Sequence, residues 1–254
     1  MFTAILSFSS RLFTLLQISK FSIIIITNLY PLIPLQSLAQ AITTFGRCVE
    51  LSQRGEIQYL NVDRYPVRSS ETSRIQEIGV IQICEPLGMK RQPRLLLEGI
   101  GLGAATRMAL QILLPRGRVM VAESVPEIIE WQRTYLEPLP KVNPPEHLRI
   151  LPMSLSQCLQ AHPESFDGIA LELDYAIDPF LESSAKIADY FYPLTLLKQA
   201  LREKGQVAIH SEAKDVPLIK ALEEEGFVVE HRIEAPHKRS KSCRHHITFA
   251  QLSA

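Results

Sequence analysis

Residues Arg94 to Glu123 read RLLLEGIGLGAATRMALQILLPRGRVMVAE. Three leucines precede a turn with three glycines, an apolar helical pattern follows, and a second apolar run ends on an acid. A short apolar run before glycines is typical of a strand that is buried on both faces of a parallel sheet. The stretch therefore predicts a strand, a tight turn, a helix and a second strand parallel to the first.

The glycine turn also has the composition of a ligand site. Gly99, Gly101 and Gly103 let the backbone turn tightly and let a ligand approach it, and the N–H groups at the start of the following helix would face that ligand. Glu123, at the end of the second run, can accept hydrogen bonds from two ribose hydroxyls. These features indicate a nucleoside-bearing cofactor at the carboxyl ends of both strands, although a purely structural turn has the same local pattern.

The composition limits the classes of function. The chain has 254 residues, which is typical of one domain with an appendage or of two small domains. Lysine plus arginine equals aspartate plus glutamate, 27 each, so the bulk charge gives no sign of a nucleic-acid partner or a membrane surface. The four cysteines include no C-x-x-C pair, which favours reduced thiols over a disulfide framework or a zinc site, and we expect no metal.

The N-terminal segment differs from the rest of the chain. No acid precedes Glu50, and the mostly apolar run from Phe21 to Leu35 is interrupted by two prolines. Ala39-Gln40-Ala41 has the form of a signal-peptidase site, while the serine-rich, acid-free composition also fits a transit peptide. The apolar run is shorter than the ~20 residues of a membrane-spanning helix, so we expect no stable span. Residues 1–41 are expected to be a targeting segment or a poorly structured extension, and the mature protein to be cytoplasmic unless they direct export.

The remaining chain divides into two parts. Within residues 42–93, the loose alternation from Glu56 to Val67 predicts a strand pair, Thr72 to Ile83 predicts a helix, and Pro86 to Pro93 resembles a polar linker. Within residues 94–254 strands and helices alternate, which predicts a parallel sheet with helices on both faces and an antiparallel last pair of strands. The predicted strands are Leu95–Glu98, Val119–Glu123, Arg149–Leu151, Gly168–Leu173, Gln206–His210, Val228–Ile233 and His246–Gln251, and the predicted helices are Ala104–Leu114, Glu127–Leu136, Leu155–Ala161, Ala185–Arg202 and Val216–Glu225.

Seven strands with a hairpin-linked final pair are the layout of the class I methyltransferase fold. Several motifs resemble the spermidine synthase-like proteins, which are relatives of the polyamine aminopropyltransferases: ICEPL at 83–87, GIGLG at 99–103, VAESVP at 121–126, EWQR at 130–133, DGIALELD at 167–174 and RHHIT at 244–248. The resemblance covers about Thr43 to Ser253. It implies a seven-stranded, mostly parallel Rossmann-like α/β sheet whose last strand is antiparallel, with a small N-terminal β region.

The resemblance also implies a cofactor and a substrate. S-adenosylmethionine, or its decarboxylated form, would lie at the glycine turn, and a small-molecule amine would be the second substrate; a homodimer is left open. Asp174 and Asp178 are the candidate catalytic acids, because a carboxylate can hold an amine and accept its proton. A helix cap or loop role for Asp174 and a turn role for Asp178 are the competing interpretations. The candidate cofactor-binding residues are Glu98, Gly99, Gly101, Gly103, Glu123 and Ser154.

Three positions depart from the family pattern. Polyamine synthases commonly carry an aspartate where this chain has Leu102, and another, near the adenine amine, where it has Ser154. After the fourth strand they carry Asp-Ser-Ser-Asp or a close variant, whereas here the second acid, Asp178, comes one residue later. Two hypotheses follow: a transferase that moves an aminopropyl or methyl group to a small amine, or a protein that keeps the fold and acts as a ligand-binding or scaffold partner.

Overall fold

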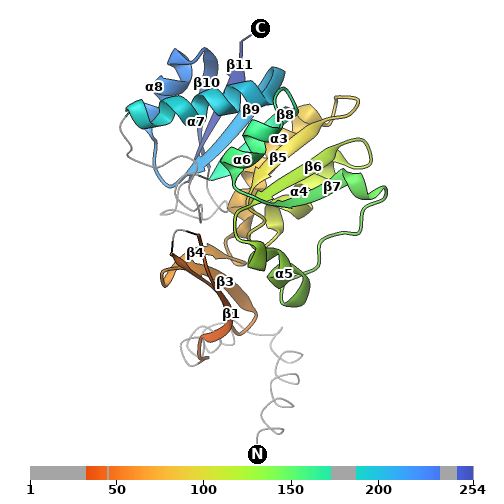
Figure 1. The fold of residues 1–254 in the computed structure, drawn as a ribbon, viewed down its shortest axis with the longest axis vertical. Helices are drawn as coiled ribbons and strands as arrows, with labels where there is room; N and C mark the ends of the chain where they lie inside the picture. The colour runs from red at the N-terminus through yellow and green to blue at the C-terminus, as the bar shows by residue number, and fades with distance from the viewer. Residues whose placement is uncertain (1–32, 45, 173–186, 235–244, 254) are drawn as a thin grey trace, which may run out of the picture.

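The computed structural model describes residues 33–44, 46–172, 187–234 and 245–253. A four-stranded sheet at the N-terminus lies below a seven-stranded sheet that carries helices on both faces (Figure 1). Among the described residues, no helix combines the length and the apolar character needed to cross a membrane.

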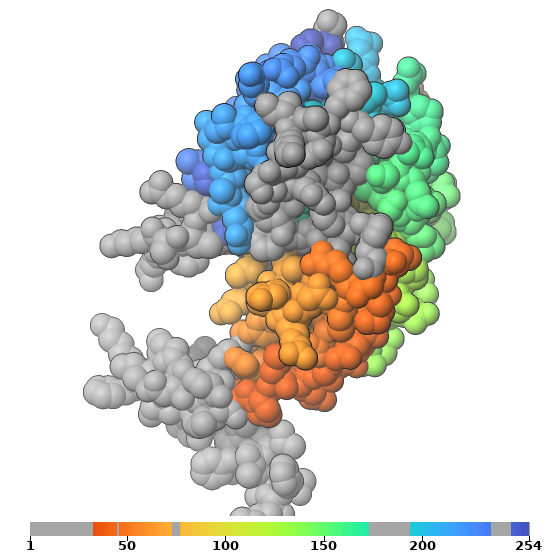
Figure 2. Space-filling model, turned by 60° about the vertical axis from the view of Figure 1, so that its left-hand side comes forward, coloured from red at the N-terminus to blue at the C-terminus, as the bar shows by residue number. Residues whose placement is uncertain are grey.

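The N-terminal sheet is antiparallel throughout, with its strands in the order of the chain. Alternate side chains of its middle strands, including Val49, Leu51, Leu60 and Val62, are buried in the same cluster as residues of the large domain. Figure 2 shows the orange strands of this sheet in direct contact with the large domain. The strands are β1 (Gln36–Ile42), β2 (Cys48–Arg54), β3 (Ile57–Val62) and β4 (Tyr65–Ser69), and the last two confirm the predicted strand pair.

Helix α3 (Ser73–Leu87) connects the two sheets and is longer than the sequence predicted. The expected linker from Pro86 is wrong at its start, because the helix continues through that proline. A proline in the last turn removes only one helical hydrogen bond. The Gly88 N–H then donates to the Cys84 carbonyl at 2.8 Å and closes the turn.

The large sheet has the strand order β10-β11-β9-β8-β5-β6-β7, in which β11 runs opposite to the other six strands. All seven predicted strands are confirmed, as are the helices between them, except that the helix predicted to end at Arg202 ends at Ala200, directly before β9 begins. The strands are β5 (Arg94–Glu98), β6 (Arg118–Glu123), β7 (Leu148–Pro152), β8 (Phe166–Glu172), β9 (Leu201–Ser211), β10 (Phe227–Glu234) and β11 (His245–Leu252), and the helices are α4 (Ala104–Leu113), α5 (Pro126–Thr134), α6 (Leu155–Ala161), α7 (Ile187–Ala200) and α8 (Val216–Glu224).

The three leucines of β5 confirm that this strand is buried on both faces. Leu95 and Leu97 belong to a core cluster with α3, α4 and the N-terminal sheet, whereas Leu96 belongs to a second cluster with α6, α7 and α8. From β5 the chain moves outward to β6 and β7 and then returns to β8 on the other side of β5. In open α/β sheets, ligands bind outside the carboxyl ends of the strands at such a reversal.

The described cysteines are free, and each is buried or partly buried. Cys84 and Cys158 are buried, and Cys48 is partly exposed. Burial raises the pKa of Cys84 to about 12 and that of Cys158 to about 11, so neither thiol ionises near neutral pH.

The expected boundary between residues 41 and 42 falls inside β1, which pairs with β2 from Gln36 onward. We expect a chain that starts at Ile33 to unfold within a few degrees of the full-length protein. A chain that starts at Ile42 loses β1 and leaves the edge of β2 unpaired. It should unfold about 5–10 °C lower, as a loss of about 2–3 kcal/mol predicts for a protein of this size. Thermal unfolding followed by circular dichroism compares the three chains, and equal midpoints for both truncations would show that β1 contributes nothing.

Candidate functional site

The backbone of the glycine turn requires glycine at three positions. Gly99, Gly101 and Gly103 have φ angles of 71°, 50° and 84°, in the left-handed region that other residues rarely adopt. A Cβ on Gly103 would lie 2.7 Å from Nη1 of Arg107, so this glycine allows close packing. A Cβ on Gly101 would meet no atom within 4 Å. Gly101 is therefore the position of the turn where a ligand can approach the backbone.

Glu123 connects the glycine turn to the loop after β6. Its carboxylate is 1 % exposed and accepts hydrogen bonds from the N–H groups of Ile100 and Val125, each at 2.9 Å. Burial raises the pKa of Glu123, although the N–H groups of Val125, Ile100 and Gly101 act in the opposite direction. A carboxylate has about four acceptor positions, so these contacts do not use all of them.

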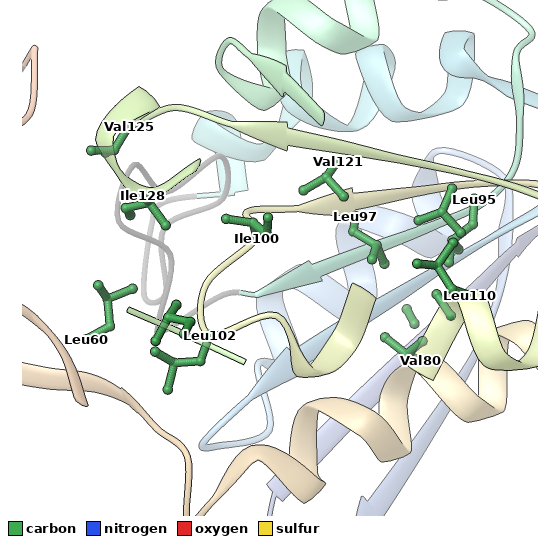
Figure 3. Packing of buried hydrophobic residues seen from close by; sticks show 14 of the residues in the cluster. Leu60, Val80, Leu95, Leu97, Ile100, Leu102, Leu110, Val121, Val125 and Ile128 are labelled. Atoms are coloured by element: carbon green, nitrogen blue, oxygen red, sulfur yellow. The ribbon is translucent and has the colours of Figure 1, made fainter. Parts of the chain in front are cut away.

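The other side chains of the turn are part of the hydrophobic core. Ile100 and Leu102 are 3 % and 6 % exposed, and Leu102 lies near Leu60 of the N-terminal sheet in Figure 3. Leu102 thus packs between the two sheets. A carboxylate is not available for a ligand at this position.

Ser154 forms the N-cap of α6. Its hydroxyl accepts a hydrogen bond from the Gln157 N–H at 3.3 Å, and the Gln157 side chain accepts one from the Ser154 N–H at 3.0 Å. This reciprocal capping box accounts for the serine by local structure alone. The residue follows β7, at the same edge of the sheet as Glu123.

Two acids meet where the strand order reverses. Glu98 ends β5, Glu172 ends β8, and the Glu98 carboxylate accepts a hydrogen bond from the Glu172 N–H at 3.0 Å. Both side chains line a small cavity together with His210 and apolar residues of α3, α4 and β11. The cavity measures about 30 Å³, which is room for a water molecule and not for a nucleoside. An adenosyl group would therefore have to lie outside it, along the glycine turn.

Glu172 contacts side chains from two other strands, and one of these contacts a third. Its Oε2 lies 2.6 Å from Nδ1 of His210 and 3.6 Å from Nη2 of Arg68, and Nε2 of His210 lies 3.0 Å from Nδ1 of His245. Burial by itself raises the pKa of Glu172, but Arg68, His210 and His245 outweigh it and hold that pKa below its usual value. In the part of the chain that the structure describes, no three histidine, cysteine or acidic side chains are arranged as metal ligands.

The sequence analysis missed this group of side chains. Asp174 and Asp178, its candidate catalytic acids, lie outside the described residues. Arg68 belongs to a different sheet, and only the order of the strands brings it to Glu172. His210 and His245 carried a weak signal, since one is near the end of a predicted strand and the other directly precedes the last one.

Comparison with solved structures places the fold. Spermidine synthase from Thermotoga maritima superposes with a TM-score of 0.62 at 14% identity, over 86% of this chain and 73% of that one. A spermidine synthase in complex with the transition-state analogue AdoDATO gives 0.62 at 15% identity, over the same shares of the two chains. The 1,6-didemethyltoxoflavin-N1-methyltransferase of Burkholderia thailandensis, with bound 1,6-didemethyltoxoflavin and S-adenosylhomocysteine, gives 0.51 at 13% identity over 85% of this chain and 100% of that one. No protein-family model matches the chain, and no curated protein matches its sequence. The protein thus has the fold that spermidine synthases share with class I methyltransferases, as the sequence predicted.

The Arg68–Glu172 ion pair gives a prediction about stability and pH. Arg68→Met leaves the mostly buried carboxylate without its cation. We expect the free energy of unfolding to fall by about 2–3 kcal/mol at pH 7, somewhat less than for a fully buried pair because His210 remains. The folded-state pKa of Glu172 lies below its ordinary value of 4.5, so the stabilisation is complete above that pH and is lost as the pH falls through the lower folded value.

Urea unfolding of wild type and variant between pH 3 and 8 measures this difference. Arg47→Met is the matched control, because its pair with Asp63 is closer, at 3.1 Å, but about half exposed, and its effect should be much smaller. Equal losses in both variants would show that the burial of Glu172 has no energetic consequence.

Proposed function

We propose that this protein is a transferase that uses an adenosyl sulfonium, either S-adenosylmethionine or its decarboxylated form, to modify a small amine. The observation that carries the proposal is the pair of carboxylates, Glu98 and Glu172, at the strand reversal beside a glycine turn that is open at Gly101. Both the sulfonium group and an amine in its ammonium form are cations. Two carboxylates at the carboxyl edge of the sheet favour the approach of such ligands.

The residues present fit an adenosyl group at the turn. We place it against the backbone at Gly101, with the ribose on the remaining acceptor positions of Glu123 and the adenine toward Ser154. Glu98 would then face the amino-acid or aminopropyl part of the ligand. Support comes from the spermidine synthase with AdoDATO and the methyltransferase with S-adenosylhomocysteine, which share the fold and carry adenosyl ligands.

The transfer step needs little from the protein besides orientation and a proton acceptor. The ammonium first loses one proton, which frees the lone pair of the nitrogen. The nitrogen then forms a bond to the carbon next to the sulfonium, the carbon–sulfur bond breaks, and its electron pair stays on sulfur. We propose that Asp174, two residues after the end of β8, orients the amine, and that Asp178 holds the second amino group of a diamine.

A second candidate is a protein that binds an adenosyl ligand or a partner without catalysis. The observations that favour it are the burial of Ile100 and Leu102 in the core and the use of Ser154 as a helix cap. Both candidates predict a folded glycine turn. They differ in turnover, since the second binds without forming a product.

Ligand binding tests the proposed cofactor. Gly101→Ala places a methyl group where the backbone is open, so it should weaken binding of an adenosyl ligand at least about tenfold, a cost of about 1.4 kcal/mol. Isothermal titration calorimetry with S-adenosylmethionine, decarboxylated S-adenosylmethionine and methylthioadenosine measures the effect.

Gly46→Ala is the matched control for this substitution. It has a similar left-handed φ of 78° and equally open space, and it lies in the turn between β1 and β2. Both variants carry a conformational cost of about 1–2 kcal/mol, but only Gly101→Ala should lose affinity. A wild type that binds none of the three ligands at millimolar concentration would end the cofactor proposal.

Turnover separates the two candidate functions. Asp174→Asn keeps the shape of the side chain and removes the charge that would orient the amine. It should lower the rate about 10²-fold through misplacement of the amine, with little effect on adenosyl binding. The assay is product formation from either sulfonium donor with putrescine and related diamines. A wild type that binds the donor and modifies no amine favours the second candidate, and a fully active Asp174→Asn variant removes this residue from the mechanism.

A further inference from the structure

Two histidine pairs of the same geometry cross the last strands of the large sheet. His210 pairs with His245, and His231 pairs with His246; in each pair the nearest ring nitrogens are 3.0 Å apart and the ring centroids 5.1 Å apart. His245 and His246 are consecutive in β11, so the two pairs lie on opposite faces of the sheet. The two pairs differ in the second contact of one ring. Nδ1 of His210 meets the Glu172 carboxylate at 2.6 Å, whereas Nδ1 of His231 meets the hydroxyl of Thr248 at 3.3 Å.

The contact with Glu172 determines which nitrogen of His210 carries a proton. Glu172 and His210 stand opposite each other in the parallel pairing of β8 and β9. An ionised carboxylate can only accept hydrogen bonds, so a contact of 2.6 Å requires a proton on Nδ1 of His210. In the neutral ring, Nε2 is then an acceptor, and its partner, Nδ1 of His245, must be the donor.

His245 is suited to this donor role. It is 6 % exposed, and burial together with His210 lowers its pKa, although Glu172 acts in the opposite direction. The ring therefore stays neutral near pH 7 and can donate through Nδ1. The other charged groups that face this chain are Arg68 from β4, Glu98 from β5 and His246 on the neighbouring position of β11.

The contacts also distinguish the two carboxylate oxygens of Glu172. Arg68 and His210 both approach Oε2, and the same side chain lines the cavity at the strand reversal. We propose that His210 and His245 are positioning residues that keep Glu172 ionised, with Oε1 directed to the acceptor amine of the transfer reaction. This inference rests on the proposed function. Oε1 takes one proton from the ammonium, the freed lone pair of the nitrogen forms the new carbon–nitrogen bond, and the carbon–sulfur bond breaks toward sulfur, while the proton on Nδ1 of His210 stays in place.

Without the donor at His245, the proton of the neutral His210 ring should no longer be held on Nδ1. With a proton on Nε2 instead, the ring would present a lone pair to the carboxylate, and Glu172 would take up a proton more readily. His245→Leu removes the donor at similar size. His245→Asn keeps an N–H donor near the position of Nδ1 and should restore the wild-type behaviour.

The first measurement uses the full chain without any ligand. Nitrogen-15 NMR of the histidine rings at pH 7.5 should show His210 as the Nδ1–H tautomer in wild type and His245→Asn, and a shift toward Nε2–H in His245→Leu. His246→Leu, in the matched pair that has no carboxylate, should leave His210 unchanged. Wild type with His210 as the Nε2–H tautomer overturns the proposal, and because that spectrum needs no variant, the test holds even where His245→Leu does not fold.

The second measurement is the pH profile of kcat/KM with the adenosyl donor and a diamine. In His245→Leu the acid limb should move to higher pH by about one unit or more, because Glu172 loses a hydrogen bond that favours its charged form. His245→Asn and His246→Leu should keep the wild-type limb. Identical profiles for His245→Leu and His246→Leu overturn the positioning role while the proposed function stands. Inactivity of wild type with every amine overturns the proposed function and, with it, the role assigned to Glu172.

Discussion

The partial burial of two carboxylates, Glu98 and Glu172, at the strand reversal is the constraint on which the rest of the site depends. The ladder between β5 and β8 ends at Leu97 and Ala170, and beyond it the two strands separate. The Glu172 N–H needs an acceptor at that point, and the Glu98 carboxylate provides it. Each buried carboxylate then needs partners of its own, because an unpaired charge in the interior is costly. Arg68 and His210 meet that need for Glu172 from two other strands.

This requirement also fixes the N-terminal sheet. Arg68 reaches Glu172 from β4, and the apolar face of β2 and β3 joins the cluster that contains Ile100 and Leu102 of the glycine turn. The turn therefore has two surfaces with different roles. Its buried side chains hold the two sheets together, and its backbone at Gly101 stays accessible. The replacement of an acid by Leu102 fits this division, since a charge there would be buried between the sheets without a partner.

Local pattern predicted the large sheet well, because each of its strands is short, apolar and bounded by a turn. It did not predict β1, whose residues Ala39 to Ala41 match a signal-peptidase site and whose structure depends on pairing with β2. The glycines and the acids Glu98 and Glu123 lie at the strand ends where the sequence placed them, and their role in binding a ligand stays a prediction. Arg68 and His210 meet Glu172, and His245 meets His210, only through strand order and register, which local periodicity does not contain.

The two acids of β8 differ in their surroundings, in a way that agrees with the role proposed for Glu172. Asp167, at the amino end of the strand, is also buried, and it binds Lys90 at 2.7 Å, Arg202 at 3.2 Å and the Arg94 N–H at 2.9 Å. These bonds tie β8 to its neighbours at the edge where α/β sheets do not bind ligands. Glu172 lies at the opposite edge, beside a cavity, and contacts His210, which in turn contacts His245, a ring whose pKa burial lowers. Apolar side chains of similar volume commonly stabilise a protein as well as a buried ion pair does. Apolar contacts could therefore hold the two sheets together without Glu172. To accept a proton from an amine, in contrast, a protein needs an ionised carboxylate with a fixed orientation.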